Sequence, residues 1–269
     1  MSNKLYNILV PVDFSTKNKW AIAKAIELSN SFHCNIHLVH VRNSANNLFK
    51  SDTSTEKSLK KLSRLKAMYK NQLCGEGTIE ISLLTGNRQK QLSCYIDQYE
   101  MDLVIIGLSK FNVLQRVISS VSISRLAKKT NIPVLAVRPG GLLCHFKKIV
   151  LPVSGEIPIR QIRLAALLGR AFKSTVYFVS LRQHADNKNQ HIVDKALEIV
   201  QSISIIPVQC FLLEGKNLAK STLEFSRKIN ADLIMINPVK DFRLPGLWNR
   251  ITNKLLSYGS KIPVLTVKG

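Results

Sequence analysis

The chain contains one pattern of segments twice. Residues 102–106 (DLVII) and 132–137 (IPVLAV) recur as residues 232–236 (DLIMI) and 262–267 (IPVLTV), in both cases 130 positions later. A repeat of this length indicates a duplicated domain, because the units of solenoid proteins are much shorter, at about 20–50 residues. With 269 residues, the chain is long enough for two separate cores. The sequence therefore predicts two similar domains, residues 1–139 and 140–269.

Apolar runs alternate with helical patterns along both halves. Such an alternation predicts right-handed crossovers and a parallel sheet that helices cover on both faces. In the first half, the expected strands are residues 6–12, 35–42, 78–84, 102–107 and 133–138, and the expected helices are residues 17–32, 52–73, 89–99 and 114–129. In the second half, the expected strands are near residues 147–153, 175–181, 206–213, 232–237 and 263–267. Residues 138–141 (RPGG) mark the boundary, because Pro and Gly together interrupt regular structure.

Local features refine this layout. We expect Ser15 to cap the first helix, because serine oxygens accept hydrogen bonds from the free N–H groups of a helix start. The two halves are offset by 141 residues at their openings and by 130 later, so the first half has an additional loop, expected at residues 43–55. The helix expected at residues 52–73 is basic, and we interpret its cations as a solvated face. Its apolar residues are expected in the core: Leu59, Leu62, Leu65 and Met68.

Composition narrows the class of protein. The net charge is +22, with +11 in each half, which favours association with anions but also fits a lysine-rich surface without a nucleic-acid motif. The apolar run at residues 103–108 is too short to cross a bilayer, and the opening residues do not resemble a signal segment. The five cysteines form no Cys-x-x-Cys pair, which indicates reduced thiols. We therefore expect a cytoplasmic protein with no membrane partner.

Neither metal binding nor catalysis is indicated. A strand at residues 35–42 sends His37 and His40 to opposite faces, so these residues are not expected to share a metal with the neighbouring His33 and Cys34. The chain has no Gly-x-Ser-x-Gly, no His-Glu-x-x-His and no Gly-x-x-x-x-Gly-Lys-Ser/Thr motif. We therefore expect no enzyme, or at most slow ATP hydrolysis.

A candidate ligand site lies where the first and fourth strands of the first half end. Parallel sheets bind ligands at the carboxyl ends of strands, where the strand order reverses. There Asp13 can accept hydrogen bonds from ribose hydroxyls, hold Mg²⁺ or cap the next helix. Lys110 can add positive charge, and Ser119 and Ser120 can hold phosphate or serve as ordinary surface residues.

These segments resemble the universal stress protein family. The resemblance rests on the opening ILVPVDFS at residues 8–15, on residues 102–107 (DLVIIG), on residues 132–137 and on Gly86. It extends over both halves, so the chain is similar to a tandem universal stress protein. It implies two flavodoxin-like (Rossmann-like) five-stranded parallel sheets with strand order 3-2-1-4-5. It also implies an intramolecular pseudo-dimer, in which strands 133–138 and 263–268 pair and which can dimerise further.

The resemblance also implies candidate nucleotide-binding residues, because some members of this family bind ATP or AMP. Asp13 matches the acidic residue that contacts ribose. The positions that line the adenine pocket are Pro11, Val12 and Val41. Those members carry Gly-x-x-Gly, nine further residues, and then Gly-Ser or Gly-Thr. Here the matching residues are Gly107, Lys110, Ser119 and Ser120, followed by Val121.

The phosphate half of this pattern departs from the family. Glycine permits positive φ and a close backbone approach to phosphate, which Lys110 and Ser119 obstruct. The sequence therefore disfavours a triphosphate and leaves a nucleoside monophosphate or another anion open. In the second half, Ser154 replaces Asp13 and Asn237 replaces Gly107, so we expect no nucleotide there and an architectural role instead.

Three functions stay open. The first is a cytoplasmic stress-response binding or regulatory protein that acts through a protein partner or a small anionic ligand, with any nucleotide confined to the first domain. The second is an ATP- or AMP-sensing switch in which the ligand orders residues 43–55 and the loop at Lys110. The third is association with nucleic acid or other anions that charge alone drives.

Overall fold

The computed structural model divides the chain into two compact units, Ser2–Pro139 and Gly140–Gly269, and each is described by itself. The structure describes residues 4–43, 52–108, 123–139, 145–153, 157–182, 188–203, 205–215, 217–237 and 262–268. Among these residues, no helix combines the length and the apolar character that a membrane span requires.

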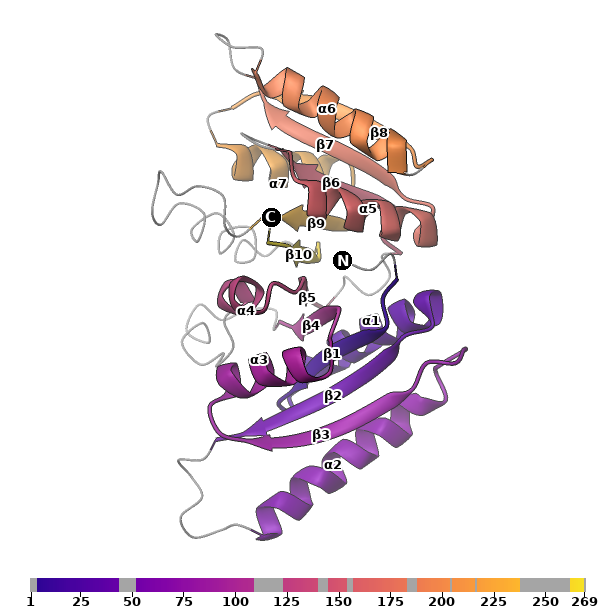
Figure 1. The fold of residues 1–269 in the computed structure, drawn as a ribbon, viewed down its shortest axis with the longest axis vertical. Coiled ribbons are helices and arrows are strands. Elements are labelled where there is room, and N and C mark those ends of the chain that lie inside the picture. The colour runs from indigo at the N-terminus through magenta and orange to yellow at the C-terminus, as the bar shows by residue number, and fades with distance from the viewer. Residues whose placement is uncertain are drawn as a thin grey trace. The chain divides into compact units, whose positions relative to one another are not determined.

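The described part of the first unit is an alternation of strands and helices (Figure 1). Its elements are β1 (Asn7–Val12), α1 (Asn18–Phe32), β2 (Asn35–Arg42), α2 (Asp52–Lys70), β3 (Ile79–Thr85), α3 (Arg88–Gln98), β4 (Leu103–Gly107), α4 (Ile123–Thr130) and β5 (Val134–Val137). The strands lie in the order β3-β2-β1-β4-β5, and every pair is parallel.

The second unit repeats this arrangement. Its elements are β6 (Lys148–Pro152), α5 (Ile159–Phe172), β7 (Thr175–Leu181), α6 (Lys188–Ile203), β8 (Val208–Leu213), α7 (Leu218–Lys228), β9 (Leu233–Ile236) and β10 (Val264–Thr266). The strands lie in the order β8-β7-β6-β9-β10, again in parallel pairs. The predicted flavodoxin-like sheet with strand order 3-2-1-4-5 is therefore confirmed in both halves. The expected pairing of strands 133–138 and 263–268 stays a prediction.

Helices cover both faces of each unit's strands because the connections run in one direction from the first strand to the third and in the opposite direction from the third to the fifth, and crossovers of one hand then lie on opposite faces. In the first unit, α1 and α2 pack on one face, and α3 and α4 pack on the other (Figure 1). The core under α3 and α4 consists of Leu9, Val39, Val41, Leu92, Tyr95, Ile96, Met101, Val104, Leu126, Ala127 and Val134. Its counterpart in the second unit consists of Val150, Val179, Ala219, Leu223, Ala231, Ile234, Ile236 and Val264.

A carboxylate before the fourth strand ties that strand to the first strand in both units. Asp102 Oδ2 accepts hydrogen bonds from the backbone N–H groups of Tyr6 (2.7 Å) and Asn7 (3.0 Å), at the start of β1. Its repeat, Asp232, accepts one from the N–H of Lys148 at 2.9 Å, at the start of β6. The repeated aspartate of the DLVII and DLIMI segments is thus a structural residue that sets where the first strand begins.

Three local predictions were wrong. Ser15 does not cap α1, because that helix begins at Asn18 and the residue before it, Lys17, makes no capping hydrogen bond with its side chain. Residues 52–55 were included in both the expected loop and the expected helix, and they belong to the helix, α2, so the predicted start of that helix is confirmed. Residues 44–51 of the expected loop lie outside the described residues. On α2, only Leu62 of the expected core residues is fully buried.

The other three side chains are more exposed because they lie about 60° to 120° around the helix from Leu62, at about 100° per residue. Leu59 and Met68 are 41% and 56% exposed, and Leu65 is half-buried. The helix predicted at residues 114–129 is described from Ile123 to Thr130.

We predict that Asp102→Ala lowers the free energy of unfolding of the first unit by about 1–3 kcal/mol, because two backbone donors lose their charged acceptor. Asp102→Asn keeps one carbonyl oxygen as an acceptor, so its free energy of unfolding should fall by less. The measurement is urea denaturation in a Trp248→Phe background, where Trp20 is the only tryptophan left to report unfolding. The exposed Asp97→Ala on α3 is the control, expected to change stability by less than about 0.5 kcal/mol. Equal losses for the Asp102→Ala and Asp97→Ala variants would contradict the structural role.

Candidate functional site

The candidate site lies where β1 and β4 end side by side. β1 pairs with β4 on one side and with β2 on the other, so the strand order reverses between β1 and β4. Asp13 directly follows β1, and Leu108 directly follows β4. The structure therefore places Asp13 and Gly107 at the edge of the sheet where parallel folds bind ligands.

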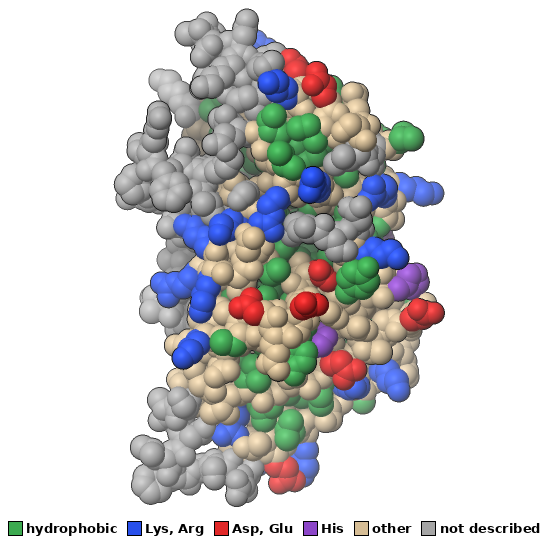
Figure 2. All heavy atoms as spheres, in the orientation of Figure 1, with side chains coloured by type: hydrophobic (Ala, Val, Ile, Leu, Met, Phe, Trp, Pro, Cys, Tyr) green, Lys and Arg blue, Asp and Glu red, His purple; other side chains and the backbone are tan. Residues whose placement is uncertain are grey.

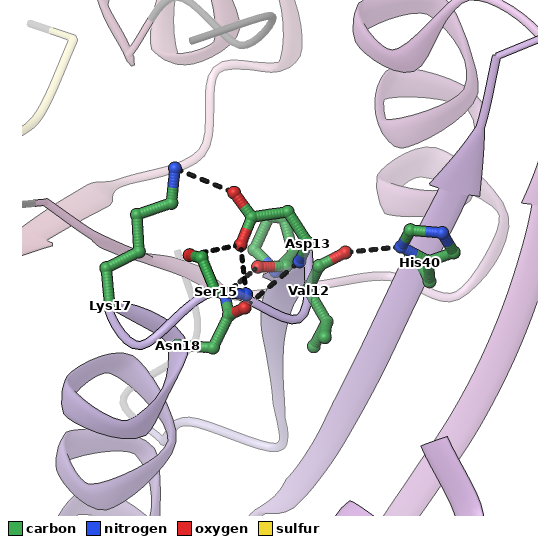
Figure 3. A network of polar contacts seen from close by, with 7 residues as sticks. Val12, Asp13, Ser15, Lys17, Asn18 and His40 are labelled. Carbon is green, nitrogen blue, oxygen red and sulfur yellow. Dashed lines mark hydrogen bonds and ion pairs between the residues drawn. The ribbon is translucent and has the colours of Figure 1, made fainter. Parts of the chain in front are cut away.

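The carboxylate of Asp13 already has several partners within its own loop (Figure 3). Oδ1 accepts hydrogen bonds from the Ser15 hydroxyl at 2.6 Å and from the Ser15 backbone N–H at 3.1 Å. Oδ2 forms an ion pair with Lys17 Nζ at 2.7 Å. The side chains of Lys17 and Asp13 are 29% and 26% exposed, so solvent or a ligand can reach this pair.

These contacts hold Asp13 ionised. Burial on its own raises the pKa of Asp13. The hydrogen bond from Lys17, the two from Ser15 and the charge of Lys17 lower it by more, so the pKa lies below the ordinary value of 3.8. A carboxylate of this kind is a strong hydrogen-bond acceptor for hydroxyl groups and a poor proton acceptor at neutral pH.

Asn18 fixes the backbone of the loop from the first turn of α1. Its side-chain Oδ1 accepts a hydrogen bond from the N–H of Asp13 at 3.1 Å, and its Nδ2 donates one to the carbonyl of Pro11 at 3.3 Å. The Asn18 residue is only 4% exposed. Sequence reasoning missed this residue, although a polar side chain on the buried side of an amphipathic helix is a signal that it has a buried partner.

His40 and Phe14 cover the other side of the loop. The parallel register of β1 and β2 pairs His40 with Val12, and His40 Nδ1 donates to the Val12 carbonyl at 2.7 Å (Figure 3). Phe14 has a φ of 60°, a left-handed conformation that is uncommon for an aromatic residue. Its ring lies 4.4 Å from the ring of His40, and Lys61 Nζ of α2 lies 5.3 Å from its centroid.

His40 is therefore held as a neutral donor. Burial lowers the pKa of His40, and so do the charges of Arg88 and Arg42. The hydrogen bond to Val12 and the charge of Asp13 raise this pKa by less, so it lies below the ordinary value of 6.5. His37 points to the opposite face, where its Nδ1 lies 2.9 Å from the hydroxyl of Tyr95. This separation confirms the predicted opposite faces of His37 and His40. Across the residues that the structure describes, no three His, Cys, Asp or Glu side chains are grouped as metal ligands.

Gly107 has a packing reason for being glycine. A Cβ atom built at this position would overlap the backbone carbonyl oxygen of Lys17. The end of β4 thus packs directly against the residue that precedes α1, and a side chain there would push the Asp13 loop away. Gly107 is not among the described residues with positive φ, so its backbone does not have the conformation that only glycine adopts easily.

The remaining predicted site residues are placed as follows. Val12 and Val41 are both 3% exposed, and Val41 is part of the core under α3 and α4. Pro11 is half-buried, with its carbonyl bonded to Asn18. Lys110, Ser119, Ser120 and Val121 lie outside the described residues.

The second unit differs at the matching edge. Ser154, which replaces Asp13, lies outside the described residues, and Asn237 directly follows β9 in place of Gly107. Helix α5 begins after Pro158, which makes no capping hydrogen bond with its side chain. Asp13, with its ion pair to Lys17, therefore has no acidic counterpart at the matching position.

Comparison with known proteins identifies a protein family. The sequence model described as Universal stress protein family matches residues 5–138. A search of curated proteins found no match to this sequence.

Solved structures share the fold over nearly the whole chain. A universal stress protein from Archaeoglobus fulgidus DSM 4304 is 12% identical and covers 99% of this chain and 97% of its own, with a TM-score of 0.76. A functionally unknown protein from Pseudomonas aeruginosa PAO1 is 15% identical and covers 99% of this chain and 93% of its own, with a TM-score of 0.62. The cytoplasmic domain of a prokaryotic cation chloride cotransporter is 14% identical and covers 98% of this chain and 96% of its own, with a TM-score of 0.57. At these identities, the likeness shows the fold alone.

Gly107→Ala should lower the free energy of unfolding of the first unit by about 1–3 kcal/mol, because the added methyl group meets backbone and not a movable side chain. Urea denaturation in the Trp248→Phe background measures it. Gly75→Ala is the matched control, since its Cβ would meet the side chain of His33, which can move. Unchanged stability of the Gly107→Ala variant would contradict the packing role and would favour a role of this glycine in ligand binding.

The lowered pKa of Asp13 makes its contribution to stability depend on pH. A group whose pKa is depressed by folding stabilises the protein above its unfolded pKa and loses this effect as pH falls through its folded pKa. We therefore expect wild type to be more stable than Asp13→Asn at about pH 6, with the difference shrinking below about pH 4. Urea denaturation at a series of pH values checks this, with Asp97→Asn as the control for the change in charge. A difference that grows on acidification would contradict the ionised state of Asp13.

Proposed function

Since this protein belongs to the universal stress protein family, we propose that it acts by binding a small ligand and a protein partner, not by catalysing a reaction. The first unit carries the ligand site, at Asp13. The second unit has the same fold and serves as a scaffold. The protein works in the cytoplasm as a regulator of stress responses.

The observation that carries this proposal is the accessible pair of opposite charges formed by Asp13 and Lys17. Among the described residues, Oδ2 of Asp13 contacts only Lys17, while Oδ1 accepts two hydrogen bonds from Ser15, so Oδ2 is the oxygen with room to accept a further hydrogen bond. A ribose hydroxyl fits this acceptor. Lys17 provides the cation for an anionic group on the same ligand. A nucleoside monophosphate combines these two features.

The geometry favours a monophosphate over a triphosphate. A triphosphate needs a row of backbone N–H groups that approach closely, which glycines usually allow. Gly107 packs closely against the Lys17 carbonyl. Lys110 and Ser119 occupy the sequence positions at which the family pattern has its further glycines. One lysine cannot replace several such donors, so the additional phosphates would gain little.

The contacts around the loop also support binding over catalysis. The lowered pKa of Asp13 makes its carboxylate a weak base at neutral pH. His40 uses Nδ1 to bond the Val12 carbonyl, which fixes its tautomer and its orientation. These two titratable groups therefore hold the loop in shape and are poorly suited to moving a proton.

Isothermal titration calorimetry of the full chain with adenosine, AMP and ATP tests the proposal. We expect one site per chain, AMP binding as tightly as ATP or more tightly, and a loss of about tenfold or more with Asp13→Ala, because the ribose loses a charged acceptor. Lys17→Gln should weaken AMP more than adenosine, since only AMP carries the phosphate. Asp97→Ala is the control with the same change in charge.

Three results of these titrations would contradict the proposal. The first is the absence of binding by all three ligands, and the second is two equivalent sites per chain. The third is ATP affinity more than tenfold above that of AMP, which would mean that a phosphate cradle exists. Turnover of ATP that depends on Asp13 would contradict the non-catalytic role.

A further inference from the structure

Helix α2 carries a positive charge that the fold does not require. It contains six Lys or Arg and two Asp or Glu, a net charge of +4. Its counterpart in the second unit, α6, contains two cations and two acids and is neutral. Both helices connect the second and third strands of the same fold. The repeat therefore acts as an internal control, and it indicates that the charge of α2 serves something other than folding.

Four of these cations form a row on the exposed side of the helix. Their spacing of three and four residues places them on one face. We call these residues the α2 cation row: Lys57, Lys60, Lys61 and Arg64, all of which are exposed. The buried side of the helix is different, because Leu62 is fully buried against the sheet. The row extends over eight residues, and its two ends lie about 10 Å apart along the helix axis.

The row keeps most of its charge. Lys60 pairs with Glu56 at 2.6 Å, but both side chains are highly exposed, at 74% and 64%, so the pair is weak. Lys61 lies over the ring of Phe14, a contact that leaves its charge uncompensated. Within the described residues, neither Lys57 nor Arg64 has an ion pair.

We propose that the α2 cation row binds the phosphate backbone of nucleic acid. A duplex carries about one negative charge per 1.7 Å of its axis, so about 10 Å of helix faces several phosphates. The row contains no aromatic side chain that would stack on a base, and it consists mainly of flexible lysines. The binding is therefore independent of base sequence and depends strongly on salt.

An anionic membrane fits the row less well. A helix that lies in a bilayer surface inserts a continuous apolar face beneath its cations. The apolar residue Leu62 is already buried in the protein core. The exposed apolar residues of α2, Leu59 and Met68, are nine positions apart and so lie on opposite sides of the helix. No apolar face of α2 is left for lipid.

Cations are also found elsewhere on the surface, and the test has to separate the row from this general charge. Figure 2 shows blue Lys and Arg side chains over much of the visible face. The matched control therefore removes the same number of charges from exposed lysines on three other helices: Lys90, Lys129 and Lys220.

The experiment measures fluorescence anisotropy of a labelled duplex DNA of about 20 base pairs with the full chain, from about 50 to 300 mM NaCl. The variant Lys57→Gln, Lys60→Gln, Arg64→Gln should bind about tenfold more weakly at the lowest salt. It should also lower the slope of log K against log [NaCl] by about two to three, or about 0.9 for each lost phosphate contact. It keeps Lys61 and its contact with Phe14. The variant Lys57→Arg, Lys60→Arg, Arg64→Lys keeps the charge and should bind as wild type does.

The outcomes separate the alternatives. The control Lys90→Gln, Lys129→Gln, Lys220→Gln should keep the wild-type slope to within about one unit. The proposal would be overturned if this control lost as much affinity as the row variant, or if the row variant bound DNA as wild type does. The absence of DNA binding by wild type at about 50 mM NaCl would also overturn it. So would row-dependent binding to vesicles with about 30% phosphatidylserine in the absence of DNA binding. If the triple variant fails to fold, Lys57→Gln and Arg64→Gln singly should each lower the slope by about one.

Discussion

The first unit is built around β1, which is held by parallel hydrogen bonds to β2 on one side and to β4 on the other. Ile8, Leu9 and Val10 at its centre are fully buried, so the strand cannot shift without exposing the core. The carboxylate of Asp102 fixes where the strand begins. Because both its start and its pairing are set, the residue that follows its end, Asp13, has one defined position at the edge of the sheet.

The loop after β1 inherits its shape from this arrangement. Asn18 binds the backbone on both sides of Val12, and His40 binds the Val12 carbonyl from the neighbouring strand. Gly107 allows β4 to approach the Lys17 carbonyl closely. The Asp13–Lys17 pair is therefore presented by a framework of strands and helix, and not by a freely moving loop. Such preorganisation is what a binding site needs if ordering is not to cost affinity.

The two units show that a fold and a site are separable. Both keep the parallel sheet, the strand order and the aspartate before the fourth strand, because these features carry packing and backbone pairing. Asp13, whose counterpart in the sequence is Ser154, and the positive charge of α2, whose counterpart α6 is neutral, are features of the first unit. Features that the scaffold does not need are where function is expected, and both proposals rest on such features.

The alternation of strands and helices in two repeated halves and the place of Asp13 after the first strand could be predicted from the sequence, because a spacing of two or of 3.6 residues between buried side chains is a local property of the chain. The strand order was predicted from the resemblance to the universal stress protein family. The partners of Asp13 could not be predicted in either way. Val12 meets His40 only through the strand register, Gly107 meets Lys17 across 90 residues, and α2 buries Leu62 while it exposes Leu59. These contacts join segments that are distant in the chain, so only the packing of the helices on the sheet decides them.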